Sequence, residues 1–160
     1  MSIVEKQDNF NKEEVINLLN HIMEMELAGV VRYTHYSLMV FGYGRIPIVS
    51  WLRDQANEAI LHAQEAGEWI TSLGGHPSLG IGPLLETHKH DIGDIMRESL
   101  ESEKTSIQMY RDLLTLVEAR SIALEEYARR MIHEEIKHAT EVDKMLRKPG
   151  EIQSYESQLN

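Results

Sequence analysis

Six acidic and imidazole side chains recur at matching distances in the two halves of the sequence. In each half a glutamate precedes a histidine by 35 or 36 residues, and a second glutamate lies three or four residues before that histidine. Residues three or four apart share one face of a helix. Carboxylates and imidazoles that converge from four helices form carboxylate-bridged dimetal sites. The pattern therefore predicts such a site, with these candidate ligands: Glu26, Glu58, His62, Glu103, Glu135 and His138.

Glycine and proline residues divide the chain into four long stretches that could carry these groups. We expect helices over about 11–40, 47–73, 89–118 and 121–147. Helices of that length span about 40 Å at 1.5 Å per residue and must pack side by side. The first and last links are short, whereas the middle link is long and rich in glycine and proline. The sequence predicts an all-α four-helix bundle with one long crossover between the second and third helices.

The composition fits one domain over residues 1–160, with the bundle over about 12–147 and a short polar C-terminal tail. Because the chain has no cysteine, disulfides and thiolate metal sites are excluded. A net charge of -10 argues against nucleic acid as a partner. No run approaches the about 18 apolar residues of a membrane span. The first 20 residues also lack the apolar segment of a signal peptide. We therefore expect a cytoplasmic protein without membrane contact.

The apolar face expected on each helix is interrupted near its middle by one of the candidate ligands. On the last helix, for example, this face includes Met131, Glu135, His138, Val142 and Met145. An isolated buried charge is costly, so interruptions in all four helices favour one shared site. A bundle with buried Glu–His hydrogen bonds and no metal is the alternative explanation.

The other histidines have weaker patterns. His35 and His133 lie off the expected apolar faces, and His88 is expected at the surface. Glu86 and His90 are four residues apart near the expected start of the third helix, where we expect a solvated pair.

Three segments resemble known proteins. They are ELAGVVRY (Glu26–Tyr33), SEKTSIQMY (Ser102–Tyr110) and HEEIKHA (His133–Ala139). They are similar to ligand-bearing segments of the ferritin-like superfamily, and of bacterioferritin in particular. The resemblance extends over about residues 12–147.

This resemblance implies an iron-binding homo-oligomer that acts as a ferroxidase. Such a protein oxidises Fe(II) to Fe(III) with dioxygen or peroxide, for iron storage or detoxification. Tyr33 is implied as a catalytic residue that could donate an electron. The implied di-iron centre has Glu26 and His62 on one ion, Glu103 and His138 on the other, and Glu135 with Glu58 as bridges.

Three features depart from the bacterioferritin pattern. Ala59 stands three residues before His62, where that family has a glutamate, and Glu58 is its neighbour. Ile60 stands where bacterioferritin presents its haem-ligating methionine, so we do not expect haem. The tail after Pro149 is too short for a substantial fifth helix. A rubrerythrin-like peroxide-reducing protein, a DNA-protecting mini-ferritin and a non-catalytic bundle with a degenerate metal site remain the alternatives.

Overall fold

A bundle of helices accounts for most of the computed structural model, which describes residues 9–160. Part of the polar N-terminal stretch, and with it the start of the domain predicted over 1–160, lies outside the described residues. The described helices are α1 (Lys12–Met39), α2 (Arg45–Ser72), α3 (Ile92–Val117), α4 (Ile122–Leu146) and the short 3-10 helix η2 (Glu156–Leu159).

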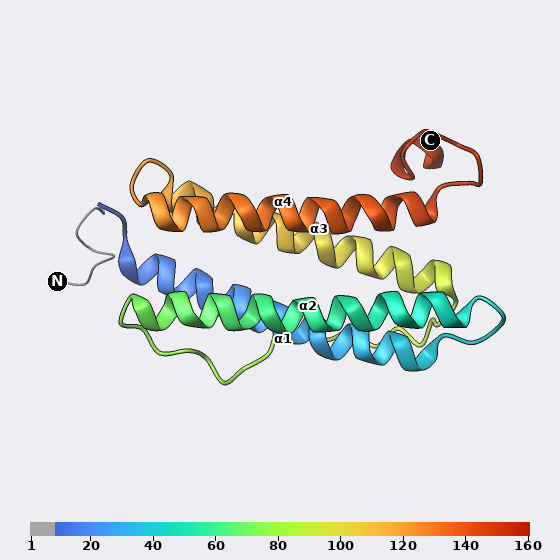
Figure 1. Ribbon diagram of the computed structural model, residues 1–160, viewed down its shortest axis with the longest axis horizontal. Helices are drawn as coiled ribbons and strands as arrows, with labels where there is room; N and C mark the ends of the chain where they lie inside the picture. Colours follow the sequence, from blue (N-terminus) through green and yellow to red (C-terminus); the bar gives the residue numbers. More distant parts are fainter. Residues whose placement is uncertain (1–8) are drawn as a thin grey trace.

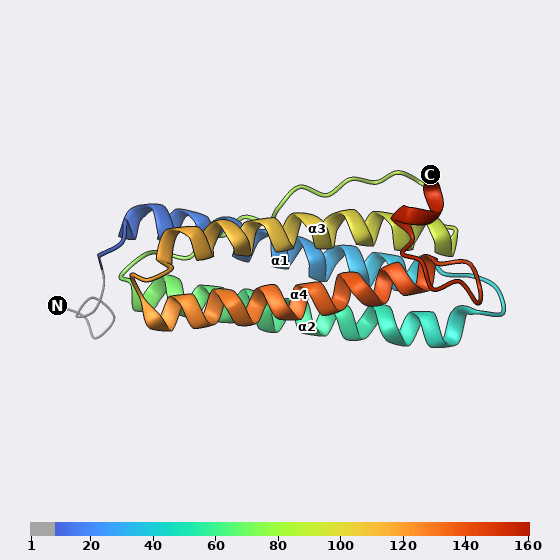
Figure 2. The same cartoon turned by 90° about the horizontal axis from the view of Figure 1, so that it is seen from above.

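The four long helices form two antiparallel pairs. α1 packs along α2, α3 packs along α4, and the pairs meet where α1 lies beside α3 (Figures 1 and 2). No strand occurs in residues 9–160, so the all-α four-helix bundle predicted from the sequence is confirmed. Nor does any helix of these residues combine the length and apolarity that crossing a membrane would need.

Polar side chains fix where three of the helices begin. Asn11, Asp91 and Ser121 each accept a hydrogen bond from the backbone N–H group three residues further on, at the starts of α1, α3 and α4. The third helix begins at Ile92 rather than at the expected Lys89, because the Asp91 cap sets its start.

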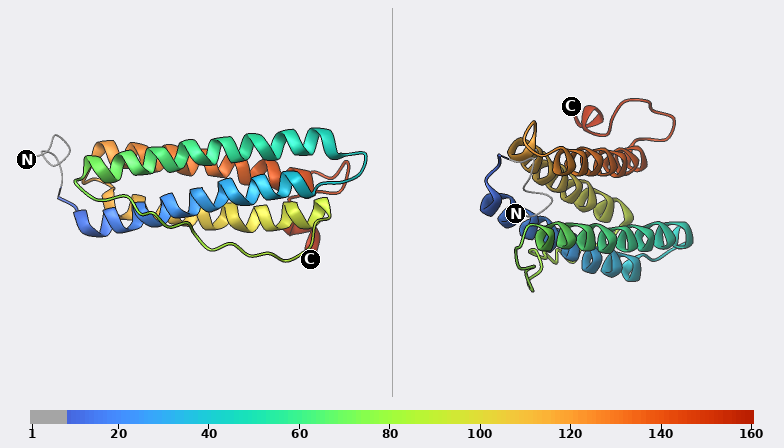
Figure 3. Two further views of the ribbon diagram at one scale, coloured as in Figure 1. Left: turned by 90° about the horizontal axis from the view of Figure 1, so that it is seen from below. Right: turned by 60° about the vertical axis from the view of Figure 1, so that its left-hand side comes forward.

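The crossover (residues 73–91) runs along α1 to the opposite end of the bundle, as Figure 3 shows from below. The backbone N–H of Gly82 donates to the carbonyl oxygen of Glu24 at 2.7 Å. A Cβ at position 82 would lie 3.2 Å from that oxygen and 3.3 Å from Cα of Met25. Glycine therefore lets the crossover lie directly on the α1 backbone. The long crossover predicted from the sequence is confirmed.

The apolar core consists of two clusters, one toward each end of the bundle. Leu19, Tyr110 and Met131 belong to the first cluster. Leu52 and Val142 belong to the second. Polar side chains separate the two clusters at the middle of the bundle, where the candidate ligands lie.

Two details at the end of α4 refine the sequence analysis. The buried face continues from Val142 to Leu146, so Met145, expected on that face, is instead 39% exposed. The tail folds back onto the bundle, since the N–H of Tyr155 donates to Asp143 Oδ2 at 2.8 Å and Lys104 pairs with a carboxylate of η2.

Candidate metal centre

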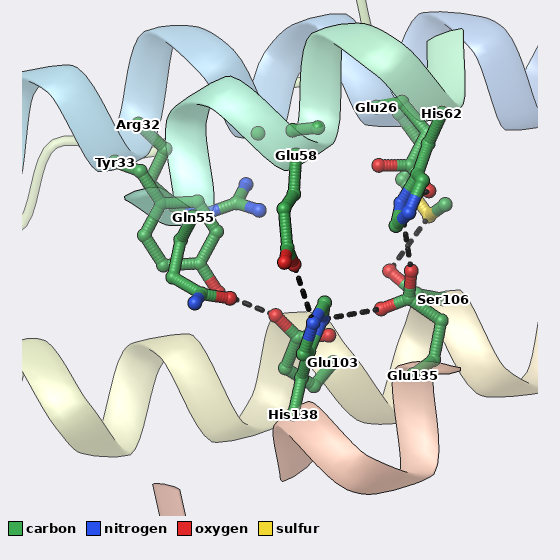
Figure 4. A pocket seen from close by; sticks show the side chains of 13 residues that line it. Glu26, Arg32, Tyr33, Gln55, Glu58, His62, Glu103, Ser106, Glu135 and His138 are labelled. Carbon is green, nitrogen blue, oxygen red and sulfur yellow. Dashed lines mark hydrogen bonds and ion pairs between the residues drawn. The ribbon is translucent and has the colours of Figure 1, made fainter. Parts of the chain in front are cut away.

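The side chains that the sequence singled out meet between the helices (Figure 4). They line a cavity of about 20 Å³, which holds little more than one water-sized group. Three of the carboxylates are almost fully buried, with exposed fractions of 3–6%. α1 contributes Glu26, α2 contributes Glu58 and His62, α3 contributes Glu103, and α4 contributes Glu135 and His138.

Two groups of potential ligands share one carboxylate. Glu26, His62 and Glu135 form the first group, and Glu103, Glu135 and His138 form the second. Within each group the ligand atoms all lie within 4.8 Å of one another. Glu135 presents Oε1 to His62 Nδ1 at 3.2 Å and Oε2 to His138 Nδ1 at 3.7 Å. A carboxylate that faces two ligand groups with separate oxygens is placed to bridge two cations.

Two tyrosines connect the halves of the centre. The hydroxyl of Tyr33 donates to Glu103 Oε1 at 2.5 Å, and the hydroxyl of Tyr110 donates to Glu26 Oε1 at 2.9 Å. Each tyrosine lies seven residues after the glutamate of its own helix and bonds to the glutamate of the other half. The sequence repeat thus corresponds to a reciprocal arrangement in space, in which each half positions a carboxylate of the other.

Glu58 lies on the outer side of His138. Its Oε2 is 2.6 Å from His138 Nε2, whereas Nδ1 of that ring faces Glu135. Glu58 belongs to neither ligand group, and its side chain is 47% exposed. Ligand histidines commonly bind a carboxylate through their outer nitrogen, which orients the ring. The position of Glu58 favours this role, which differs from the bridging role expected from the sequence.

Ala59 supplies no carboxylate to the cavity and is buried beside Gly29. A Cβ added at Gly29 would lie 3.5 Å from that of Ala59, so the two helices approach closely here. On this side of the centre, therefore, the described part of the chain places no second bridging carboxylate opposite Glu135.

Burial and hydrogen bonding distribute protons unevenly among the ligands. Burial raises the pKa of Glu26, and it raises that of Glu103 well above its usual value, with the hydrogen bond to Glu135 adding to the effect. Burial lowers the pKa of His62, but its hydrogen bonds to Glu135 and Glu26 outweigh this and raise it to about 10. Burial raises the pKa of Glu135, but hydrogen bonds to His138 and His62 lower it overall.

The charge balance of this cavity fits a bound cation. Within the described residues, the ion pairs of the buried carboxylates are with His62 and His138. Arg32 also lines the cavity, but in residues 9–160 it forms no ion pair with these carboxylates. Once they have released their protons, three buried carboxylates against two neutral imidazoles carry negative charge that cations would offset. The donor set of oxygens and imidazole nitrogens suits divalent metals of the first transition row.

A family model confirms the resemblance seen in the sequence. The model described as the ferritin-like domain matches residues 16–151. The chain belongs to the ferritin-like family.

Solved structures of several bacterial proteins are similar to this ferritin-like chain. A ferritin-like, diiron-carboxylate protein from Bacillus anthracis is 23% identical, with a TM-score of 0.75 over 85% of this chain and 97% of that one. The dodecameric thioferritin of Bacteroides fragilis, a bacterioferritin-related protein, is 19% identical, with a TM-score of 0.77 over 89% and 88%. The bacterioferritin of Desulfovibrio desulfuricans, described with a diiron site, is 27% identical, with a TM-score of 0.74 over 84% and 78%. The similarity to bacterioferritin is thereby confirmed. No curated protein matches the sequence.

The structure also adds a third residue, His35, to the Glu86 and His90 pair expected from the sequence. His35 of α1 lies beside Glu86 and His90 of the crossover, and the three form another group of potential ligands. Glu86 and His90 form the pair expected from the sequence, with His90 Nε2 3.4 Å from Glu86 Oε1, but both residues precede α3, and His88 between them has a left-handed φ of 55°. Only the folding of the crossover onto α1 brings His35 to this pair, and no sequence spacing signals that contact.

Proposed function

We propose that this ferritin-like protein is a ferroxidase that oxidises Fe(II) to Fe(III) with dioxygen or peroxide, for iron storage or detoxification. The observation that carries the proposal is the position of Glu135, whose two oxygens face two separate groups of ligand atoms. The similar proteins from Bacillus anthracis and Desulfovibrio desulfuricans, described as diiron proteins, support the choice of iron.

Five side chains would hold the two iron ions, and Glu58 would orient the ring of one of these ligands, His138. Bound iron supplies one-electron chemistry, which anionic oxygen ligands favour because they stabilise Fe(III) over Fe(II). The hydrogen bonds from Tyr33 and Tyr110 fix the carboxylates of both halves before a cation arrives. The proposed ligands are Glu26 and His62 for one ion, Glu103 and His138 for the other, and Glu135 as the bridge.

Tyr33 is the residue that we propose as an electron donor. Burial and the negative charge of Glu103 raise the pKa of Tyr33 well above 10, so the hydroxyl keeps its proton at neutral pH. A tyrosine that loses an electron also becomes a strong acid and must release this proton. Glu103, at 2.5 Å from the hydroxyl, is placed to accept it while a bound cation keeps this carboxylate deprotonated. Coupling the two transfers avoids leaving a buried charge without a partner.

The proposal is tested by replacing the two α4 ligands together. Glu135→Ala with His138→Ala removes the shared carboxylate and one imidazole, so the rate of Fe(II) oxidation should fall by about 100-fold or more. The formation of Fe(III) is followed by stopped-flow absorbance with dioxygen and, separately, with peroxide. The matched control is His133→Ala with Glu134→Ala, since His133 is exposed and Glu134 pairs with Lys137.

Equal rates in the two double variants, both with wild-type helix content by circular dichroism, would contradict the ferroxidase proposal. Faster turnover with peroxide than with dioxygen would favour the rubrerythrin-like alternative. Metal binding without oxidation of Fe(II) by either oxidant would favour the non-catalytic bundle.

A further inference from the structure

A second cluster of histidine and glutamate lies where the crossover passes over α1. One ligand atom from each of His35, Glu86 and His90 lies within 4.8 Å of the others. His35 Nε2 is 2.8 Å from Glu86 Oε2, and His90 Nε2 is 3.4 Å from Glu86 Oε1. The two rings meet edge to face, with centroids 5.8 Å apart. Two imidazoles thus approach the two oxygens of one carboxylate.

The hydrogen-bonding state of these imidazoles indicates what the cluster could bind. The Nε2 atoms of His35 and His90 are both buried. Glu86 is within ion-pair distance of both, but neither atom has a hydrogen-bond partner of acceptable geometry in residues 9–160. Buried polar nitrogens are normally paired. A cation among the three side chains would satisfy the lone pairs of both neutral rings and the charge of the carboxylate.

We propose that His35, Glu86 and His90 form a second site, for a single divalent transition-metal cation such as Zn(II), Co(II) or Fe(II). Two histidines and one carboxylate are a common protein ligand set for these metals. Three protein ligands leave the remaining coordination positions to water. This proposal does not depend on the ferroxidase activity of the bundle centre.

The surrounding contacts hold the three ligands in place. Thr87, next to Glu86, donates a hydrogen bond to the carboxylate of Glu98 on α3. Tyr36, next to His35, donates to the same carboxylate at 2.7 Å. The N–H of His88 donates to Glu86 Oε1 at 2.5 Å. The crossover at Thr87 and α1 at Tyr36 are therefore tied to one carboxylate of α3, which reduces the entropy cost of ordering the ligands when a cation binds.

The local charge predicts the order in which the sites fill. The three proposed ligands line a cavity of about 220 Å³. Arg32 and Lys89 line it as well, and Glu98 offsets one of these two positive charges. The bundle centre instead has three buried carboxylates. We therefore expect the second site to bind more weakly and to fill after the centre.

The site is tested by titrating the full-length protein with Zn(II) in a calorimeter. His35→Asn and His90→Asn should each weaken the binding of one Zn(II) equivalent per chain by about tenfold or more, and should leave the tighter equivalents unchanged. His88→Asn is the matched control, because His88 lies beside the same carboxylate but is 84% exposed, with Nδ1 3.9 Å from Glu86. The imidazole NMR signals of His35 and His90 should shift with Zn(II), and that of His88 should not.

The same titration in the Glu135→Ala, His138→Ala protein separates the two sites. One weak equivalent should remain there and should be lost when His90→Asn is added. Glu86→Gln, a nearly isosteric change on a half-exposed side chain, gives a third variant if the histidine substitutions reduce folding. Unchanged Zn(II) binding in the folded His35, Glu86 and His90 variants would overturn the second site. A loss of iron oxidation alone would bear only on the bundle centre.

Discussion

At the scale of single residues, Glu58 shows how one position along a helix changes the role of a carboxylate. Residue 59 faces the cavity wall beside Gly29, but it is an alanine. Its neighbour Glu58 points about 100° further around the helix and reaches the outer nitrogen of His138 instead. The carboxylate therefore contacts a ligand and not the shared space between the two ligand groups.

Removing this carboxylate should weaken metal binding without abolishing it. Glu58→Ala leaves every proposed ligand in place but frees the His138 ring, so we expect the affinity for Zn(II) at the bundle centre to fall by about 10- to 100-fold. Calorimetric titration measures the change, and Asn57→Ala, at an exposed position of the same helix, is the control. A complete loss of one bound cation would instead show that Glu58 is itself a ligand.

The protons held by the centre predict how its stability depends on pH. In protein treated with a chelator, the pKa of His62 is about 10, above its ordinary value of 6.5. A group whose pKa is raised in the folded state stabilises the fold below pH 6.5, where it is protonated in both states. This contribution is lost as the pH rises through 10. The raised pKa values of Glu26 and Glu103 likewise make the free energy of unfolding fall as the pH rises above 4.5. The free energy of unfolding should therefore fall between about pH 6.5 and pH 10.

Bound metal should reverse this trend, because cations bind the deprotonated ligands and gain affinity as the pH rises. Urea denaturation across this pH range, with EDTA or with Zn(II), measures both effects. His62→Gln removes the raised pKa and should flatten the EDTA curve. If the free energy of unfolding of the wild-type protein in EDTA rose with pH, the raised pKa values of the ligands would be contradicted.

At the scale of helices, local sequence was sufficient to place most of the fold. Glycine and proline residues mark the helix ends, and apolar periodicity identifies the buried faces, because both act within a few residues. The same periodicity placed Glu26, Glu103 and Glu135 on inward faces, and all three are buried. Their roles as ligands stay a prediction, since geometry alone does not show a bound metal.

The contacts that sequence could not indicate all depend on segments far apart in the chain. The carboxylate of Glu58 contacts a histidine on another helix. His35 meets Glu86 because the crossover follows α1, through contacts such as that of Gly82 with Glu24. Such contacts follow from how the elements pack, and periodicity within one element carries no information about them.

At the scale of the whole molecule, half of the exposed large apolar side chains lie on elements that are neighbours in the fold. They lie on α1, on the turn after it, on the start of α2 and on the crossover, which follows α1 (Figure 3). Exposed apolar groups gathered on neighbouring elements mark interaction surfaces more often than isolated ones do. The group comprises Val31, Leu38, Phe41, Tyr43, Ile46, Leu79, Leu84 and Leu85.

We propose that a second copy of this chain covers the apolar surface, so that the protein is a homo-oligomer. A homo-oligomer is also what the resemblance of the sequence to bacterioferritin implies. Leu79 and Leu85 are 99% and 84% exposed in the single chain, so charging them should cost the isolated fold little. Within an interface, however, each charge would lose its hydration without gaining a partner.

Leu79→Asp with Leu85→Asp should therefore shift the solution mass, measured by light scattering, from an oligomer toward a single chain. Ile122→Asp, at a 76% exposed position at the start of α4, is the control and should keep the wild-type mass. Helix content and the Zn(II) affinity of the bundle centre should be unchanged in both, because all proposed ligands of that centre come from one chain. A wild-type protein that is monomeric at every concentration would contradict the oligomer, and would leave the metal centre untouched.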